Sequence, residues 1–254
     1  MKLSFDRGGE GDRLLVLLHG LGATRHAWRP MLQSAQAHWR GCWIEPDLRG
    51  HGQSAHAQNY SLGCHACDVA ELISESGKRS EIVILGHSMG GAVGLALASG
   101  WFGVTPACVF GLGIKVEWND EELAGMRKLA ATPARVFETE DEAVARYLKV
   151  SGLSGLIAPE SAEAKAGVVQ NEKGWRLACD PATASIGQPP MRELLAAARC
   201  PIHLARGETD ALVTLDQLRE YDARAENITD AGHNAMVERP QAVWAWLSSK
   251  LHDQ

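Results

Sequence analysis

The stretch Gly86-His87-Ser88-Met89-Gly90-Gly91 follows the apolar run Ile82–Leu85 and precedes a helix-forming run from Ala92 to Ser99. A strand, a tight turn and a helix in this order lift a serine hydroxyl clear of the backbone. Gly86 and Gly90 stand two places either side of the serine, where bulkier residues would clash. The helix N-terminus favours negative charge that develops there. A glycine-rich helix entry with an incidental serine is the alternative, but the surrounding strand and helix favour a nucleophilic Ser88.

Short apolar runs alternate with helical stretches along the rest of the chain. We expect strands at Lys2–Phe5, Leu14–Leu18, Cys42–Ile44, Ile82–Leu85, Ala107–Gly111, Ile202–Ala205 and Asn227–Thr229. Near-continuous apolar strands separated by helices are typical of an α/β fold, with a mostly parallel sheet and helices on both faces. In such sheets functional groups gather beyond the carboxyl ends of the strands. Several of the expected strands are followed there by a glycine-containing turn.

The alternation of strands and helices breaks between Lys115 and Pro190. The pattern there predicts helices over Asp120–Ala131 and Glu140–Val150, and it contains no convincing central strand. We therefore expect residues 115–190 to form a helical cap over the carboxyl edge of the sheet. Residues 1–114 and 191–254 would then form the core domain.

A second glycine-rich turn, His19-Gly20-Leu21-Gly22, comes directly after the expected strand Leu14–Leu18. Acyl transfer creates an oxyanion that two preorganised donors must hold. The amide of Met89, after the nucleophile, is one expected donor, and the amide of Leu21 is the other. We interpret His19 as a structural histidine that holds this loop.

A serine hydroxyl needs a base to accept its proton. Among ten histidines, His233 stands out because it lies in a loop after the last expected strand and before the final helix, Pro240–Leu251. Asp210 follows the strand Ile202–Ala205 and is the expected partner of the base, in the order Ser, Asp, His. Glu208 in the same turn and the more distant Asp230 are its rivals.

Composition excludes several other classes of function. The formal charge is −6, whereas nucleic-acid binding calls for a basic stripe. No apolar run approaches the length of a membrane span, and the N-terminus lacks the features of a signal peptide, so we expect a cytoplasmic protein. No metal, nucleotide or flavin motif is present, and we expect no cofactor. Cys64 and Cys67 have the spacing of a redox pair or half a zinc site, but we favour reduced thiols at the start of a helix over Ser61–Ser74.

These motifs, together with Asp47-Leu48-Arg49-Gly50-His51-Gly52-Gln53-Ser54, resemble the α/β-hydrolase superfamily, in its branch of small bacterial esterases and lactonases. The resemblance covers nearly the whole chain except the expected cap. It implies that Arg49 and His51 are structural residues of the loop beside the active site. The usual leading hairpin is reduced here to a single strand or a very brief pair.

The resemblance and the motifs together predict hydrolysis of a small carboxylic ester or lactone through an acyl-enzyme, by a monomer or homodimer. One alternative is a hydrolase of carbon–carbon bonds in vinylogous diketones, with substrate-binding cations drawn from Arg127, Lys128, Arg135 and Arg146. Another is a ligand receptor on the same fold, which would turn over its ligand once or very slowly. Trp28 and Trp118 are candidates for the acyl pocket, although core aromatics share this composition.

Overall fold

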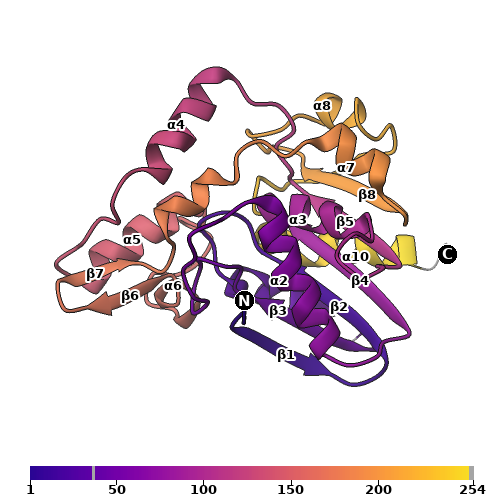
Figure 1. The fold of residues 1–254 in the computed structure, drawn as a ribbon, viewed down its shortest axis with the longest axis horizontal. Coiled ribbons are helices and arrows are strands. Elements are labelled where there is room, and N and C mark those ends of the chain that lie inside the picture. The colour runs from indigo at the N-terminus through magenta and orange to yellow at the C-terminus, as the bar shows by residue number, and fades with distance from the viewer. Residues whose placement is uncertain (36–37, 252–254) are drawn as a thin grey trace.

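A seven-stranded sheet forms the centre of the molecule in the computed structural model, which describes residues 1–35 and 38–251 (Figure 1). Its strand order is β1-β3-β2-β4-β5-β8-β9. The strands are β1 (Phe5–Gly9), β2 (Arg13–Leu18), β3 (Cys42–Pro46), β4 (Glu81–His87), β5 (Cys108–Leu112), β8 (Ile202–Gly207) and β9 (Glu226–Ile228). All neighbouring pairs are parallel except β1 and β3, which are antiparallel. The expected α/β fold is therefore confirmed.

Helices cover both faces of the sheet because successive strand residues point to opposite sides. In β2, Leu14 and Val16 pack with helices α2 (Leu62–Glu75) and α3 (Met89–Ala98). Leu15 and Leu17 pack on the other face with α1 (Arg29–Ala35) and α10 (Pro240–Leu251). Short elements complete this part: η1 (Arg25–Trp28), α7 (Met191–Ala197), α8 (Leu215–Arg219) and α9 (Ala235–Glu238).

The first strand differs from the prediction, because it runs over Phe5–Gly9 and not Lys2–Phe5. Its two glycines lie in the antiparallel ladder opposite Cys42 and Trp43. A Cβ on Gly8 would come within 2.6 Å of the Trp43 ring, so the indole occupies the space that a side chain would need. A flanking strand that depends on its neighbour's indole in this way cannot be recognised from its own sequence.

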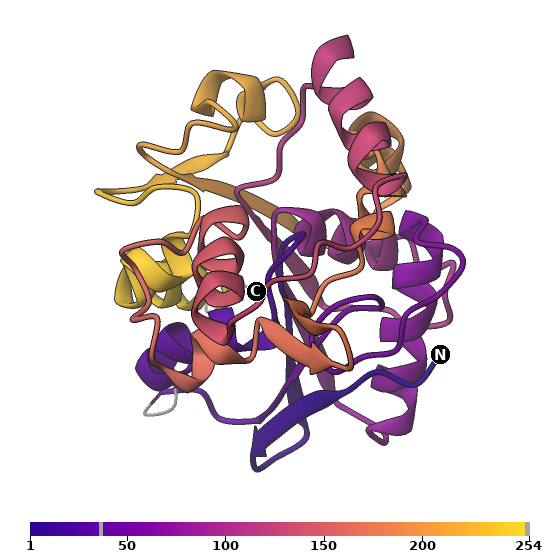
Figure 2. The same ribbon diagram turned by 90° about the vertical axis from the view of Figure 1, so that its left-hand side faces the viewer.

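Residues 115–190 contain α4 (Asp120–Ala130), α5 (Glu140–Val150), α6 (Ala162–Lys165), the strands β6 (Val168–Asn171) and β7 (Gly174–Leu177), and η2 (Pro181–Ile186). Figures 1 and 2 show α4, α5 and the β6–β7 hairpin together at one end of the sheet. The β6–β7 hairpin was not predicted. Trp175 in its second strand forms an isolated antiparallel β-bridge with Phe137. The division into a core domain and a cap stays a prediction.

The two longer helices of this segment begin at capping boxes, in which side chain and backbone bond reciprocally: Asn119 with Glu122, and Thr139 with Glu142. The apolar face of α5 is buried as expected, including Tyr147 and Leu148. In contrast, α4 has no fully buried residue. Helix α4 is therefore held in place mainly by its contacts with η2, because it has no buried apolar face.

Within the described residues, no helix is long and apolar enough to cross a membrane. Cys64 and Cys67, which have the spacing of a redox pair, are both unpaired thiols at the start of α2, and Cys67 is exposed.

Candidate active site

Ser88 lies between the end of β4 and the start of α3, in a strained conformation. Its φ is 49° and its ψ is −116°, a region that non-glycine residues rarely adopt and that costs about 1–3 kcal/mol. A Cβ on Gly86 would come within 2.2 Å of the Gly90 carbonyl oxygen. The Ser88 amide donates to the Leu112 carbonyl at 2.8 Å, which ties the turn to β5. The tight turn expected from the sequence is therefore present, and backbone contacts keep Ser88 in its strained conformation.

Asp210 lies just beyond β8, beside His233. The His233 Nδ1–H donates to Asp210 Oδ2 at 2.9 Å, and the Leu212 amide donates to Oδ1 at 2.8 Å. The Asp210 side chain is fully buried. Among the described residues, neither of the two alternative acids is paired with His233. The Glu208 carboxylate accepts the Asp230 amide, and the Asp230 side chain is largely exposed. Asp210 therefore orients the imidazole and fixes its tautomer.

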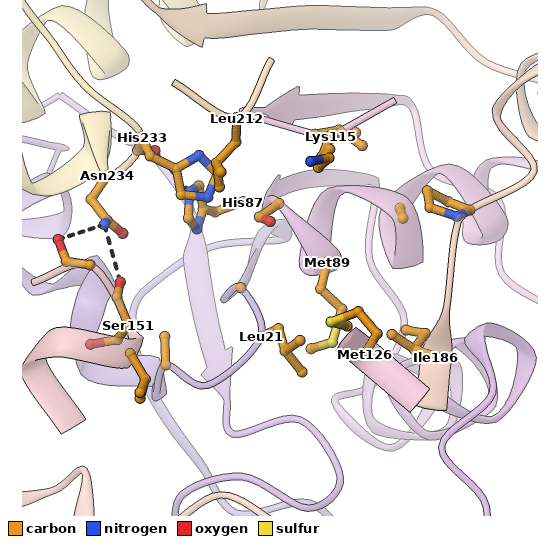
Figure 3. A pocket seen from close by; sticks show the side chains of 18 of the residues that line it. Leu21, His87, Met89, Lys115, Met126, Ser151, Ile186, Leu212, His233 and Asn234 are labelled. Atoms are coloured by element: carbon orange, nitrogen blue, oxygen red, sulfur yellow. Dashed lines mark hydrogen bonds between the residues drawn. The ribbon is translucent and has the colours of Figure 1, made fainter. Parts of the chain in front are cut away.

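Ser88 and His233 both line a cavity of about 390 Å³. Figure 3 shows His233 at this cavity. No hydrogen bond joins Ser88 to another side chain among the residues that the structure describes. Hydrogen bonds of this kind are often long in unliganded enzymes and shorten when substrate binds. Because both residues line the same cavity, a molecule bound there would lie within reach of both.

The two expected oxyanion donors, Leu21 and Met89, also line this cavity. Within the described residues, neither backbone amide has a hydrogen-bond partner, so both N–H groups are free to donate to a ligand. Met89 is the first residue of α3, where the helix dipole adds to the attraction for an anion. The arrangement suits an oxygen that becomes negatively charged.

Two buried histidines hold the loop that carries Leu21. His51 Nε2 accepts the Gly22 amide at 3.1 Å, and His19 Nε2 accepts the Leu48 amide at 2.9 Å. The two rings meet edge to face, 5.0 Å between centroids. Burial lowers the pKa of His19 well below its usual value, so its imidazole is neutral and can accept. Both histidines are thus structural, as we interpreted them.

Arg49 is the second residue that the resemblance implied to be structural. Its guanidinium forms a bidentate pair with Asp68 of α2, with distances of 2.7 and 2.8 Å, and also donates to the Asn59 carbonyl. These bonds fix the loop after β3 to helix α2.

His87 has a contact that we did not predict. The sequence places it next to the nucleophile but says nothing of His233, 146 residues later. The His87 Nε2–H donates to the His233 carbonyl at 2.9 Å, and the two rings lie 4.6 Å apart. Burial holds the pKa of His87 well below its usual value. A neutral His87 therefore holds the His233 backbone without placing a charge beside the His233 ring.

Of the two aromatic candidates for the pocket, only Trp118 lines the cavity. Its ring lies under the Lys115 ammonium at 5.0 Å. The prediction for Trp28 is wrong, because its side chain is 0% exposed and packs in the core with Met31 and Leu32. The register of η1 turns Trp28 toward the helix layer and away from Ser88.

The cations that line the cavity are not those proposed from the sequence. Arg127, Lys128, Arg135 and Arg146 are absent from the lining, whereas Lys115 and Lys149 belong to it. Lys115 is paired with Glu122. Within the described residues, Lys149 forms no ion pair.

Asn234, next to His233, joins the site to the segment 115–190. Its side-chain amide donates to the carbonyls of Ser151 and Gly152, at 3.2 and 3.1 Å, just after α5 (Figure 3). The loop of His233 and the end of α5 therefore keep a fixed relation across the cavity.

The chain belongs to the alpha/beta hydrolase family, whose sequence model matches residues 15–246. It is 29% identical over 248 residues to 2-succinyl-6-hydroxy-2,4-cyclohexadiene-1-carboxylate synthase of Salmonella typhimurium, covering 93% of this chain and 92% of the synthase. It is also 33% identical to epoxide hydrolase 4 of Homo sapiens, but over 36% of this chain and only 25% of that relative. The magnesium-chelatase 30 kDa subunit of Rhodobacter capsulatus is 40% identical over 37% of this chain and 32% of its own.

Solved structures show the same fold at lower sequence identity. E-2-(acetamidomethylene)succinate hydrolase has a TM-score of 0.79 at 21% identity, covering 98% of this chain and 95% of its own. An esterase of Thermogutta terrifontis has a TM-score of 0.73 at 22% identity, covering 99% and 93%. These comparisons support a hydrolase and leave the bond that it cleaves to be inferred from the site.

Proposed function

We propose that this protein hydrolyses carboxylic esters or lactones through an acyl-enzyme. The observation that carries the proposal is the convergence on one cavity of Ser88, the His233–Asp210 pair and the two free amides of Leu21 and Met89. His233 would take the proton of Ser88, whose oxygen attacks the carbonyl carbon. The free amides would hold the oxyanion, and His233 would then protonate the leaving group. Water would release the acid by the same route.

The lining of the cavity favours an apolar acyl group. Aliphatic and thioether side chains are the largest group among its lining residues: Leu21, Ala23, Leu62, Met89, Ala92, Ile114, Met126, Val150, Ile186 and Leu212. Figure 3 shows Met126 and Ile186 from the segment 115–190 near Leu21 and Met89. We propose that this segment acts as a cap that excludes water and selects the acyl group. The length of acyl chain preferred would then depend on these side chains.

Carbon–carbon bond cleavage is a second candidate, which two observations favour. Lys115 and Lys149 line the cavity and could bind a carboxylate or ketone of such a substrate. The full-length similarity to the synthase described above also extends beyond esterases. Cleavage of a vinylogous diketone would use the same serine, histidine and oxyanion donors.

A rate panel separates these candidates. We would measure kcat/KM for p-nitrophenyl esters of increasing chain length, several lactones and one vinylogous diketone, with Ser88→Ala as the control. Multiple turnovers of an ester or lactone, lost in the variant, are the expected result. Turnover of the diketone alone would favour the second candidate. A single turnover of every substrate would indicate a receptor and contradict both enzymatic proposals.

A further inference from the structure

Three potential metal ligands meet on the face of the sheet that carries α1, outside the cavity. Asp6 comes from β1, His26 from η1 and Glu45 from β3, and one ligand atom of each lies within 4.8 Å of the others. We call these three residues the acid–histidine cluster. None of them lines the cavity of Ser88. The cluster therefore needs an explanation separate from the proposed hydrolysis.

Two atoms of the cluster are buried without a hydrogen-bond partner. Glu45 is only 2% exposed, and its Oε2 has no partner; His26 is 9% exposed, and its Nδ1 has none. Buried polar groups are nearly always paired, because an unpaired group loses its water without replacement. The His26 Nδ1 lies 4.0 Å from Asp6 Oδ2. This gap is too long for a hydrogen bond. Two ligands at about 2.1 Å from one ion lie about 3.0 to 3.4 Å apart, so the two side chains would move together by about 1 Å or less when an ion binds.

The charge around the cluster also calls for a cation. Arg25 is paired with Asp47, and Arg29 binds Glu163 at 2.8 Å, so each guanidinium already has a carboxylate outside the cluster. Both arginines also approach Asp6, at 3.1 and 3.9 Å. With four carboxylates against two guanidinium groups and a neutral imidazole, the net charge of the ionised site is −2. One divalent ion would neutralise it.

A proton is the competing occupant. Burial, and then the charge of Asp6, raise the pKa of Glu45 to about 8, so the metal-free carboxyl group is mostly protonated at neutral pH. A proton satisfies the carboxyl group but leaves the His26 Nδ1 without a hydrogen-bond partner. Burial and the two arginines lower the pKa of His26, which keeps the imidazole neutral, the form that binds metals.

We propose that the acid–histidine cluster binds one divalent transition-metal ion, Mn²⁺ or Zn²⁺, which links β1 to β3 and η1. One imidazole nitrogen and two carboxylate oxygens suit these ions, and Asp6, 38% exposed, leaves a side open for water to complete the coordination. Because the site lies outside the cavity, the ion stabilises the edge of the sheet and takes no part in ester chemistry.

The test uses Mn²⁺ as the probe, because thiolates select softer ions and cysteine side chains will not compete for it. The full-length protein is stripped with EDTA and dialysed, and free Mn²⁺ is followed by electron paramagnetic resonance during titration. We expect one ion per chain, displaced by Zn²⁺. Glu45→Gln should weaken binding at least tenfold, whereas the matched control Glu121→Gln, an exposed acid of α4, should bind like the wild type.

Stability provides a second readout. Mn²⁺ should raise the melting temperature of the wild type and not that of Glu45→Gln, because a ligand stabilises only a state that binds it. If Glu45→Gln does not fold, Asp6→Asn at the exposed side of the site takes its place. The absence of saturable Mn²⁺ binding, or equal binding by the wild type and the folded variant, would overturn the proposal.

Discussion

Replacing Asp210 with asparagine tests whether the acid of the site is the residue that the structure pairs with His233. Asparagine keeps the volume of the side chain, but it removes the charge. It can also present an amide N–H to His233 Nδ1 at the place where Asp210 Oδ2 accepts at 2.9 Å. The imidazole would then carry its proton on Nε2, the atom that has to accept from Ser88. Both effects act on the transition state, in which the imidazole becomes positively charged.

The size of the effect follows from the geometry. For a carboxylate and an imidazolium 2.9 Å apart, an effective dielectric constant of about 20 gives an attraction of about 6 kcal/mol, and about 4 kcal/mol if the charge centres are about 4 Å apart. At about 1.4 kcal/mol per tenfold change, the loss corresponds to about 10³ to 10⁴ in kcat. The same substitution in a serine protease triad costs about 10⁴.

The assay is kcat for the best p-nitrophenyl ester, measured for Asp210→Asn and for Glu208→Gln as the matched control. Glu208 lies in the same turn, and its carboxylate accepts only the Asp230 amide among the described residues, so its substitution should change kcat less than about threefold. Circular dichroism establishes that both variants are folded. A larger loss in Glu208→Gln than in Asp210→Asn would refute the assignment of the acid.

Four further predictions concern the nucleophile, the cavity, chelation and pH. Ser88→Ala should lower ester turnover about 10⁶-fold while the fold remains intact, and residual activity above about one hundredth would contradict its role as nucleophile. Met126→Ala should shift the preference toward longer acyl chains without slowing the reaction of Ser88 with a small organophosphonate; an unchanged ranking of esters would count against selection by the cap. EDTA and reductants should leave ester turnover unchanged, because the proposed chemistry uses no metal or disulfide, and inhibition by either would contradict it. In metal-free protein the wild type should lose stability relative to Glu45→Gln as pH rises from about 4.5 through about 8. The Glu45 carboxyl group ionises at a lower pH in the unfolded chain than in the folded protein, because its pKa is raised only in the folded state. Parallel melting curves across that range would show that Glu45 does not titrate in this way.

The sequence alone was enough to predict the features that depend on interactions between residues close together in the chain. The turn at Ser88 needs glycines at fixed offsets between a strand and a helix, and this requirement is visible in six consecutive residues. The bounds of α5 and α10 were also predicted, because amphipathic spacing in one and a proline at the start of the other act over a few turns. The choice of Asp210 followed from its order in the chain and its place after a strand.

Contacts between distant segments were decided only by the tertiary structure. In the glycine-rich strand β1, which pairs with β3, Gly8 lies against the Trp43 ring, and Trp28 packs in the core with residues of α1. His87 meets His233 across 146 residues, and Asp6, His26 and Glu45 converge from three separate elements. Short-range patterns specify helices, strands and turns, whereas these neighbours depend on how the strands are ordered in the sheet and how the helices close over it. That ordering is a property of the whole packed chain, because no single segment can bury its apolar face alone.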